Sequence, residues 1–118
     1  MCPEAWTRCR GWVLAALEPG CAREDELVAE LTAGQAQLWA GARCALVTQC
    51  VRDPSGLSLH VWLAGGDLDE ILALRPGLEA WGRAMGCTRL TLNGRKGWAR
   101  VLRPHGFRPA GDDLERRL

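Results

Sequence analysis

The chain has 118 residues, 47% of them hydrophobic, and a formal net charge of +1 at pH 7. This length suits one domain, residues 1–118, around one core, and no apolar run is long enough to cross a bilayer. The first residues do not resemble a secretory leader, and the near-neutral charge argues against a dedicated nucleic-acid-binding domain, so we expect a cytoplasmic protein.

The N-terminal part predicts two helices. Apolar side chains recur every three or four residues over 6–17, and Pro19-Gly20 follows as a stop signal. A second stripe runs through 24–33, with acidic residues in its first turn and Gly34 after its end.

Three strands follow, at 37–39, 43–51 and 57–63. Both faces of 43–51 are largely apolar, which predicts a strand that is covered on both sides. The sequence Asp53-Pro54-Ser55-Gly56 favours a tight turn, so strands 43–51 and 57–63 should pair as an antiparallel hairpin.

The C-terminal half alternates helices and strands. Pro76 interrupts a helical pattern, which predicts two helical pieces at 67–74 and 76–85. The order is completed by a strand at 89–92, parallel to 57–63, a helix at 96–103 and a last strand at 107–110. The sequence predicts no element for the polar tail 112–118. The predicted fold class is α/β, with a mixed central sheet built from an antiparallel meander and a βαβ unit, and helices on both faces.

The six cysteines form neither a Cys-x-x-Cys pair nor a zinc pattern with the two histidines. We therefore expect no metal site and free thiols. Residues 81–118 carry nine basic and three acidic side chains. This basic region is either solvated surface or a surface for an anionic ligand.

Two segments resemble the GNAT superfamily of acyl-CoA-dependent N-acyltransferases. The C-terminal segment, Trp98 to Phe107, is similar to the family's ending of a helix followed by Gly-Phe. The segment from His60 to Glu70 looks like that of small GNAT-like proteins of phages and prophages. The resemblance covers about residues 22–110 and implies a GNAT-like fold, acetyl-CoA or another acyl-CoA as cofactor, a phage or prophage origin, and host cytoplasm or a virion as the location.

The resemblance places a phosphate-binding turn after the central strand. The matching turn begins at Ala64, Gly65 and Gly66, whose backbone would hold the cofactor phosphates, and the backbone groups of Leu63 and Ala64 would pair with the pantetheine arm. No Arg or Gln precedes the glycines, and three acids follow them. Asp67 and Glu70 fit a helix N-terminal capping box, and they would also repel a phosphate.

The catalytic positions implied by the resemblance are also altered. The family's general-acid tyrosine corresponds to Leu102, and the position that contacts the pantetheine arm corresponds to Arg95. His60 lies on the central strand and is the candidate general base, or a packed histidine.

Two functions therefore stay open. One is acyl transfer to an amine, carried by a small molecule or a protein, with a degenerate cofactor turn. The other is a non-catalytic GNAT-like phage protein that serves as a binding, virion or assembly factor for a phage or host protein.

Overall fold

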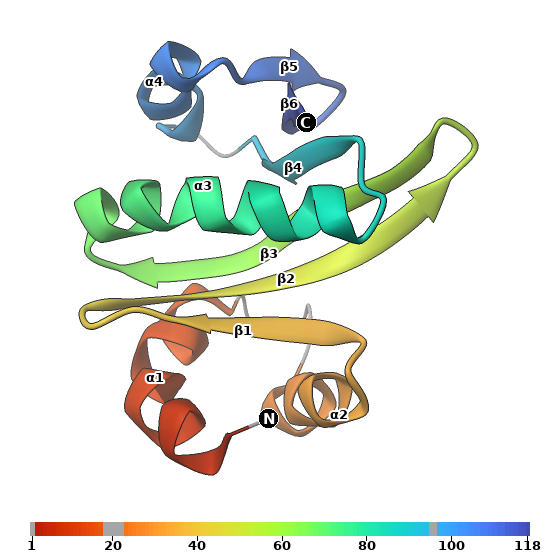
Figure 1. Cartoon of the computed structure of the whole chain (residues 1–118). Coiled ribbons are helices and arrows are strands. Elements are labelled where there is room, and N and C mark those ends of the chain that lie inside the picture. The colour runs from red at the N-terminus through yellow and green to blue at the C-terminus, as the bar shows by residue number, and fades with distance from the viewer. Residues whose placement is uncertain (1, 18–22, 95–96) are drawn as a thin grey trace. The chain divides into compact units, whose positions relative to one another are not determined.

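A computed structural model describes residues 2–17, 23–94 and 97–118 (Figure 1). Its elements in chain order are α1 (Pro3–Ala16), α2 (Glu24–Ala33), β1 (Ala36–Ala40), β2 (Cys44–Asp53), β3 (Gly56–Gly66), α3 (Leu68–Ala84), β4 (Arg89–Asn93), α4 (Trp98–Leu102), the 3-10 turn η1 (Arg103–His105), β5 (Arg108–Ala110) and β6 (Asp113–Arg117). Among the described residues, no helix is both long and apolar enough to span a membrane.

The strands form one mixed sheet in the order β1-β2-β3-β4-β6-β5. A two-residue turn joins β2 to β3, and the Ser55 amide donates to the Asp53 carboxylate there over 2.8 Å. Strand β4 pairs parallel to β3, with Leu59 opposite Leu90, after the crossover through α3. The predicted hairpin and βαβ unit are both confirmed, and so is the mixed α/β class.

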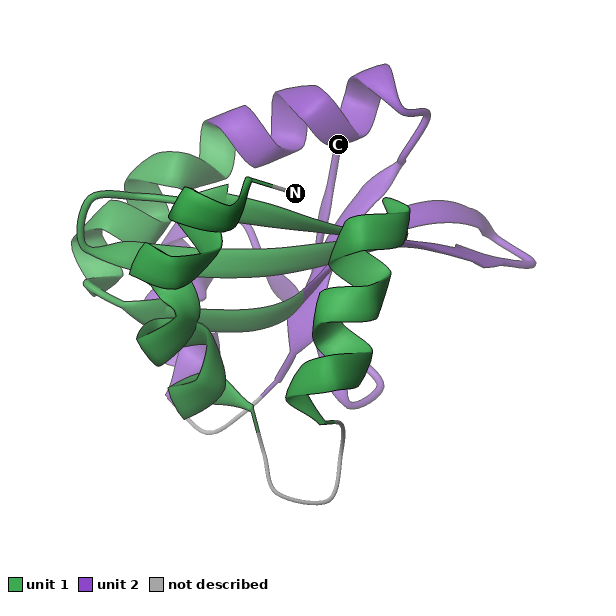
Figure 2. Cartoon of the chain, turned by 90° about the horizontal axis from the view of Figure 1, so that it is seen from below, with its two compact units in different colours: residues 1–49, 62–76 green, residues 50–61, 77–118 purple. Residues whose placement is uncertain are grey.

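The chain divides into two compact units, coloured separately in Figure 2. Unit 1 comprises residues 1–49 and 62–76, and unit 2 comprises residues 50–61 and 77–118. Strands β2 and β3 and helix α3 each contribute residues to both units. The expectation of a single domain stays a prediction.

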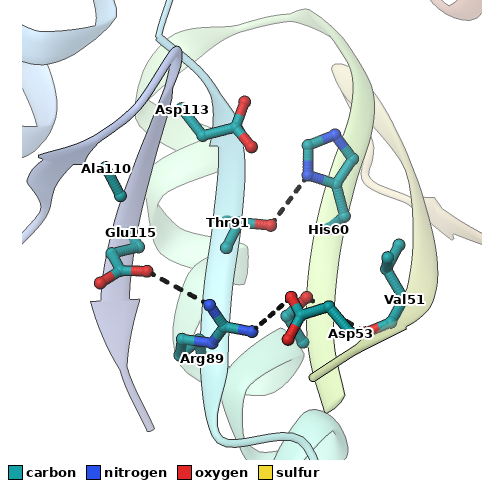
Figure 3. Close-up of a pocket in the computed structure, with 9 residues that line it drawn as sticks. Val51, Asp53, His60, Arg89, Thr91, Ala110, Asp113 and Glu115 are labelled. Atoms are coloured by element: carbon teal, nitrogen blue, oxygen red, sulfur yellow. Dashed lines mark hydrogen bonds and ion pairs between the residues drawn. The ribbon is translucent and has the colours of Figure 1, made fainter. Parts of the chain in front are cut away.

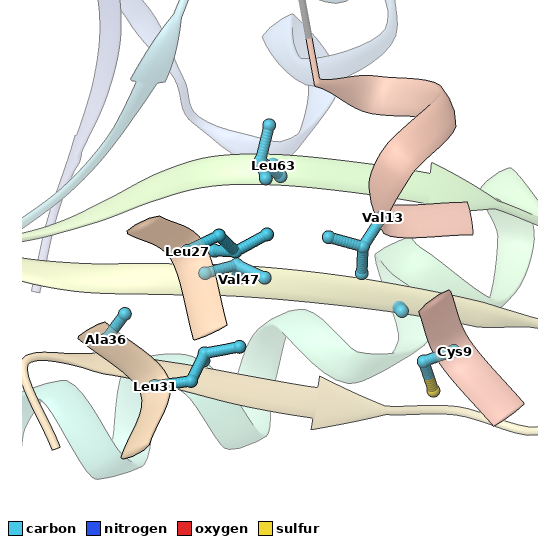
Figure 4. Close-up of a cluster of buried hydrophobic side chains, with 8 residues drawn as sticks. Cys9, Val13, Leu27, Leu31, Ala36, Val47 and Leu63 are labelled. Atoms are coloured by element: carbon cyan, nitrogen blue, oxygen red, sulfur yellow. The ribbon is translucent and has the colours of Figure 1, made fainter. Parts of the chain in front are cut away.

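Unit 1 has its core where α1 and α2 meet one face of its strands (Figure 4). The helical stripes predicted from the sequence supply this core because each repeats on one side of its helix. Its buried members are Cys9, Val13, Leu27, Leu31, Ala36, Ala45, Val47 and Leu63.

The opposite face of unit 1 meets the first turn of α3. The Glu70 carboxylate approaches Gly41 and the Cys44 thiol, and Cys44 points away from the face that carries Ala45 because side chains alternate along a strand. Helices therefore lie on both faces of the sheet in this unit, as predicted.

Unit 2 is built on β4. The second half of α3 packs on Leu59, which lies close to Gly82. Leu90, Leu102, Phe107 and Leu114 are buried in this unit, each at most 4% exposed. Phe107, which follows Gly106 in the Gly-Phe segment, is thus a core residue of unit 2.

The structure corrects two sequence predictions and adds one element for which the sequence made none. The tail 112–118 contains a strand, β6, which pairs antiparallel with both β4 and β5. Helix α3 is continuous through Pro76 rather than broken there, because proline removes only one backbone donor and apolar positions on either side, such as Ile71 and Leu78, stay buried. The helix predicted at 96–103 is shorter, because α4 begins at Trp98, after its N-cap Gly97, and ends at Leu102. Residue 96 lies outside the described residues.

Candidate functional site

The glycines of the β3–α3 turn are required by close packing. A Cβ on Gly65 would clash with the backbone carbonyl of Trp12, and one on Gly66 would clash with the carbonyl of Arg43. Gly66 also has a φ of 105°, a conformation that favours glycine. Packing against neighbouring backbone therefore explains both glycines without a cofactor. Leu63, two residues before Gly65, has a side chain that is 5% exposed and belongs to the core of unit 1.

Asp67 occupies the N-terminus of α3. Its Oδ1 accepts hydrogen bonds from the backbone amides of Asp69, at 2.9 Å, and Glu70, at 3.5 Å. Its Oδ2 lies 2.9 Å from Nε of Arg43. The side-chain hydrogen bond from Arg43 lowers the pKa of Asp67, so this carboxylate stays ionised at neutral pH. The predicted cap is confirmed.

Glu70 does not complete the capping box. Its Oε1 accepts from the Arg43 amide over 2.7 Å, and this hydrogen bond is the main reason that the pKa of Glu70 is lowered. The Asp67 amide donates instead to the Arg43 carbonyl over 2.9 Å. The box was a wrong prediction because a capping box is a local motif, whereas Glu70 is satisfied by the residue that leads into β2.

The turn therefore presents a filled anion site. A helix N-terminus attracts phosphate through its free amides and dipole. Here a carboxylate already accepts from two of those amides, and a second carboxylate stands beside it. These residues do not fit the pyrophosphate of an acyl-CoA.

The other positions taken from the resemblance give little support to a cofactor site. Arg95 lies outside the described residues. Leu102 is 4% exposed and belongs to the core of unit 2, so it supplies no acid group.

His60 lies in a cleft of unit 2 (Figure 3). The cleft has a volume of about 290 Å³ and is lined by Val51, Asp53, Ser58, His60, Arg89, Thr91, Ala110, Asp113 and Glu115. Nδ1 of His60 lies 2.8 Å from the hydroxyl oxygen of Thr91. Burial lowers the pKa of His60, and the opposing effect of Asp113 is smaller, so the imidazole is neutral at pH 7.

Arg89 is held between two carboxylates on the cleft wall. Its guanidinium lies 2.8 Å from Oδ2 of Asp53 and 3.6 Å from Oε2 of Glu115, while its Nε is buried without a hydrogen-bond partner. Hydrogen bonds from Ser55 and Arg89 lower the pKa of Asp53 to about 2.

The charge of the cleft suits a cationic group. With His60 neutral, three carboxylates face one guanidinium, and the excess negative charge attracts an ammonium or another organic cation. The described residues include no group of three or more His, Cys, Asp or Glu placed to hold a metal ion.

The sequence identified only His60 among the cleft residues. Asp113 and Glu115 lie in the tail 112–118, for which the sequence predicts no element, and the sequence predicts Asp53 only as part of a turn. The alternation of Asp113, Leu114 and Glu115 was the available strand signal, although it spans few residues.

Comparisons with known proteins find distant structural likenesses. No protein-family model matches the chain, and no curated protein matches it. A chain in "The crystal structure of KacTA-DNA complex" aligns with a TM-score of 0.46 and 11% sequence identity, over 89% of this chain and 87% of that one. A likeness this distant carries no argument about what the present chain binds.

Proposed function

We propose that this chain is a GNAT-like protein that acts by binding rather than by acyl transfer. The observation that carries this proposal is the carboxylate of Asp67 on the amides that a cofactor phosphate would need. Arg43 and Glu70 reinforce that arrangement. The ligand is a cationic amine of a small molecule or of a phage or host protein, bound in the His60 cleft. A phage or prophage origin stays a prediction.

Thermal-shift titrations of the whole chain test this proposal. A primary diamine should raise the melting temperature with increasing concentration, since a ligand that binds only the folded state stabilises it, and acetyl-CoA should not. Asp113→Asn with Glu115→Gln should remove most of the diamine effect, whereas Asp25→Asn, an exposed acid on α2, should leave it unchanged. A shift with acetyl-CoA and none with diamine would overturn the proposal.

A second candidate function is N-acyl transfer, and the neutral His60 favours it. A neutral imidazole in an acidic cleft can accept a proton from a bound amine and so make the amine nucleophilic. If Nδ1 donates to Thr91, the other ring nitrogen, Nε2, is the proton acceptor. The donor of the acyl group would have to be held without the usual phosphate contacts.

An acetylation assay separates the two functions. If the chain is an acyltransferase, acetyl-CoA and a panel of primary amines will give product, and His60→Gln will lower the rate by about 10²–10⁴. Asp25→Asn should leave that rate unchanged. We expect no product above the background without protein.

A further inference from the structure

We propose that Cys50 and Cys87 are a thiol pair that closes into a reversible disulfide when the protein meets a hydroperoxide. Both residues lie in unit 2 and are 37 positions apart in the chain, yet their sulfur atoms are 3.9 Å apart. A disulfide requires the sulfur atoms to approach to roughly 2.05 Å. Closing the bond therefore requires the two sulfur atoms to come roughly 1.85 Å nearer to each other.

The backbone holds the two thiols near each other. The amide of Cys87 donates to the carbonyl of Gly82 over 2.8 Å, and Gly86 before it has a φ of 90°, so Cys87 closes the C-terminus of α3. The amide of the next residue, Thr88, donates to the carbonyl of Leu57 in β3 over 2.9 Å. Cys50 is a residue of β2. Neither thiol therefore sits on a free loop.

Exposure assigns different roles to the two sulfur atoms. Cys50 is exposed, whereas Cys87 is 5% exposed. Burial raises the pKa of the Cys87 thiol, and the exposed Cys50 thiol is the one that a hydroperoxide can reach, so Cys50 reacts first. Its thiolate takes the distal oxygen of the hydroperoxide to become a sulfenic acid, and the alcohol leaves.

The second step consumes that sulfenic acid. The Cys87 sulfur attacks the Cys50 sulfur, the S–O bond breaks and water leaves. Overall, two thiols and one hydroperoxide give one disulfide, one alcohol and one water, and a dithiol reductant reverses the oxidation of the protein.

The experiment uses a chain in which Cys2 and Cys21 are replaced by serine. Cys2 is exposed, and backbone amides lower its pKa, so it would compete for the oxidant. Cys21 lies outside the described residues. Of the six cysteines, four then remain, and Cys9 and Cys44 are each 0% exposed.

Hydrogen peroxide in small excess should lower the thiol count, measured after unfolding, from four to two. The intact mass should fall by two hydrogen atoms, and a proteolytic digest should contain a peptide pair linked through Cys50 and Cys87. The melting temperature should rise by at least about 5 °C. Dithiothreitol should restore all these values.

Cys50→Ser and Cys87→Ser are the matched controls, and in each the mass loss and the linked peptides should disappear. The proposal is overturned if Cys50 gains oxygen atoms while Cys87 stays a free thiol. It is also overturned if Cys9 and Cys44 form the only link, or if the thiol count stays at four.

Discussion

At the scale of single residues, Asp67 connects stability to the cofactor question. Replacing Asp67 with Ala should lower the free energy of unfolding by about 0.5–2 kcal/mol, because the cap on two backbone amides is lost. Its contact with Arg43, whose side chain is 68% exposed, adds little. Urea denaturation measures the difference.

Asp69→Ala is the matched control for that measurement, since Asp69 lies in the same first turn and is exposed. Asp69→Ala should lower the free energy of unfolding clearly less than Asp67→Ala does. An equal loss in the two variants would mean that favourable charge near the helix dipole, rather than capping, is the source of the stability.

His60 predicts a dependence of stability on pH. Its pKa is lowered in the folded protein, so the unfolded chain, in which the pKa is about 6.5, binds the proton more readily. Stability should therefore fall as the pH is lowered through about 6.5. His60→Gln should remove this slope when urea midpoints are compared between pH 7.5 and 5. Folding also lowers the pKa values of three carboxyl groups, Asp53, Asp67 and Glu70, so their protonation lowers the stability only at more acidic pH. A slope that survives in His60→Gln would assign it to another group.

At the scale of elements, periodicity located most of the fold. The bounds of α2 agree with the predicted 24–33, because its acidic start and Gly34 are local signals. Pro76 misled the prediction because its local penalty was given more weight than the apolar positions on either side of it, which are buried along one continuous helix. Strand β6 was missed because only Leu114 in it is strongly apolar and buried, and its backbone partners, β4 and β5, come from earlier in the chain.

That missed strand should nevertheless contribute strongly to stability. Leu114 is 3% exposed, so Leu114→Ala should lower the free energy of unfolding by about 2–5 kcal/mol. Arg117→Ala, at an exposed position of the same strand, should change it by less than about 0.5 kcal/mol. Chemical denaturation of both variants tests this. If Leu114→Ala and the unchanged chain unfold at the same denaturant concentration, β6 is dispensable for stability.

At the scale of the whole molecule, local signals in the sequence identified the turn and His60 but not the cleft. Asp53, Arg89 and Glu115 meet through strand order and register, which depend on pairing between distant segments. The sequence did reveal that a phosphate would meet acids after Gly66. It did not reveal that Arg43 would neutralise part of that charge, because Arg43 precedes β2 and is far from the turn along the chain.

The same arrangement predicts very weak binding of acetyl-CoA. Each lost charge-assisted contact to phosphate removes roughly 1.5–3 kcal/mol, and every 1.4 kcal/mol weakens affinity about tenfold. Loss of two contacts should therefore weaken binding by at least about a hundredfold. Calorimetry should detect no binding at micromolar acetyl-CoA.

The decisive variant is Asp67→Ala combined with Glu70→Gln, which frees the amides of Asp69 and Glu70 and removes two negative charges. Substituting Gly65 would be uninformative, because any side chain there collides with the Trp12 carbonyl. Provided that the double variant still melts cooperatively, it should bind acetyl-CoA at least about tenfold more tightly than the unchanged chain, since one recovered contact is worth that much. Asp69→Asn is the control, because it removes a charge from the same turn without freeing the amides. Micromolar affinity in the unchanged chain, lost in the double variant, would instead make these carboxylates part of a working cofactor site and favour the acyltransferase.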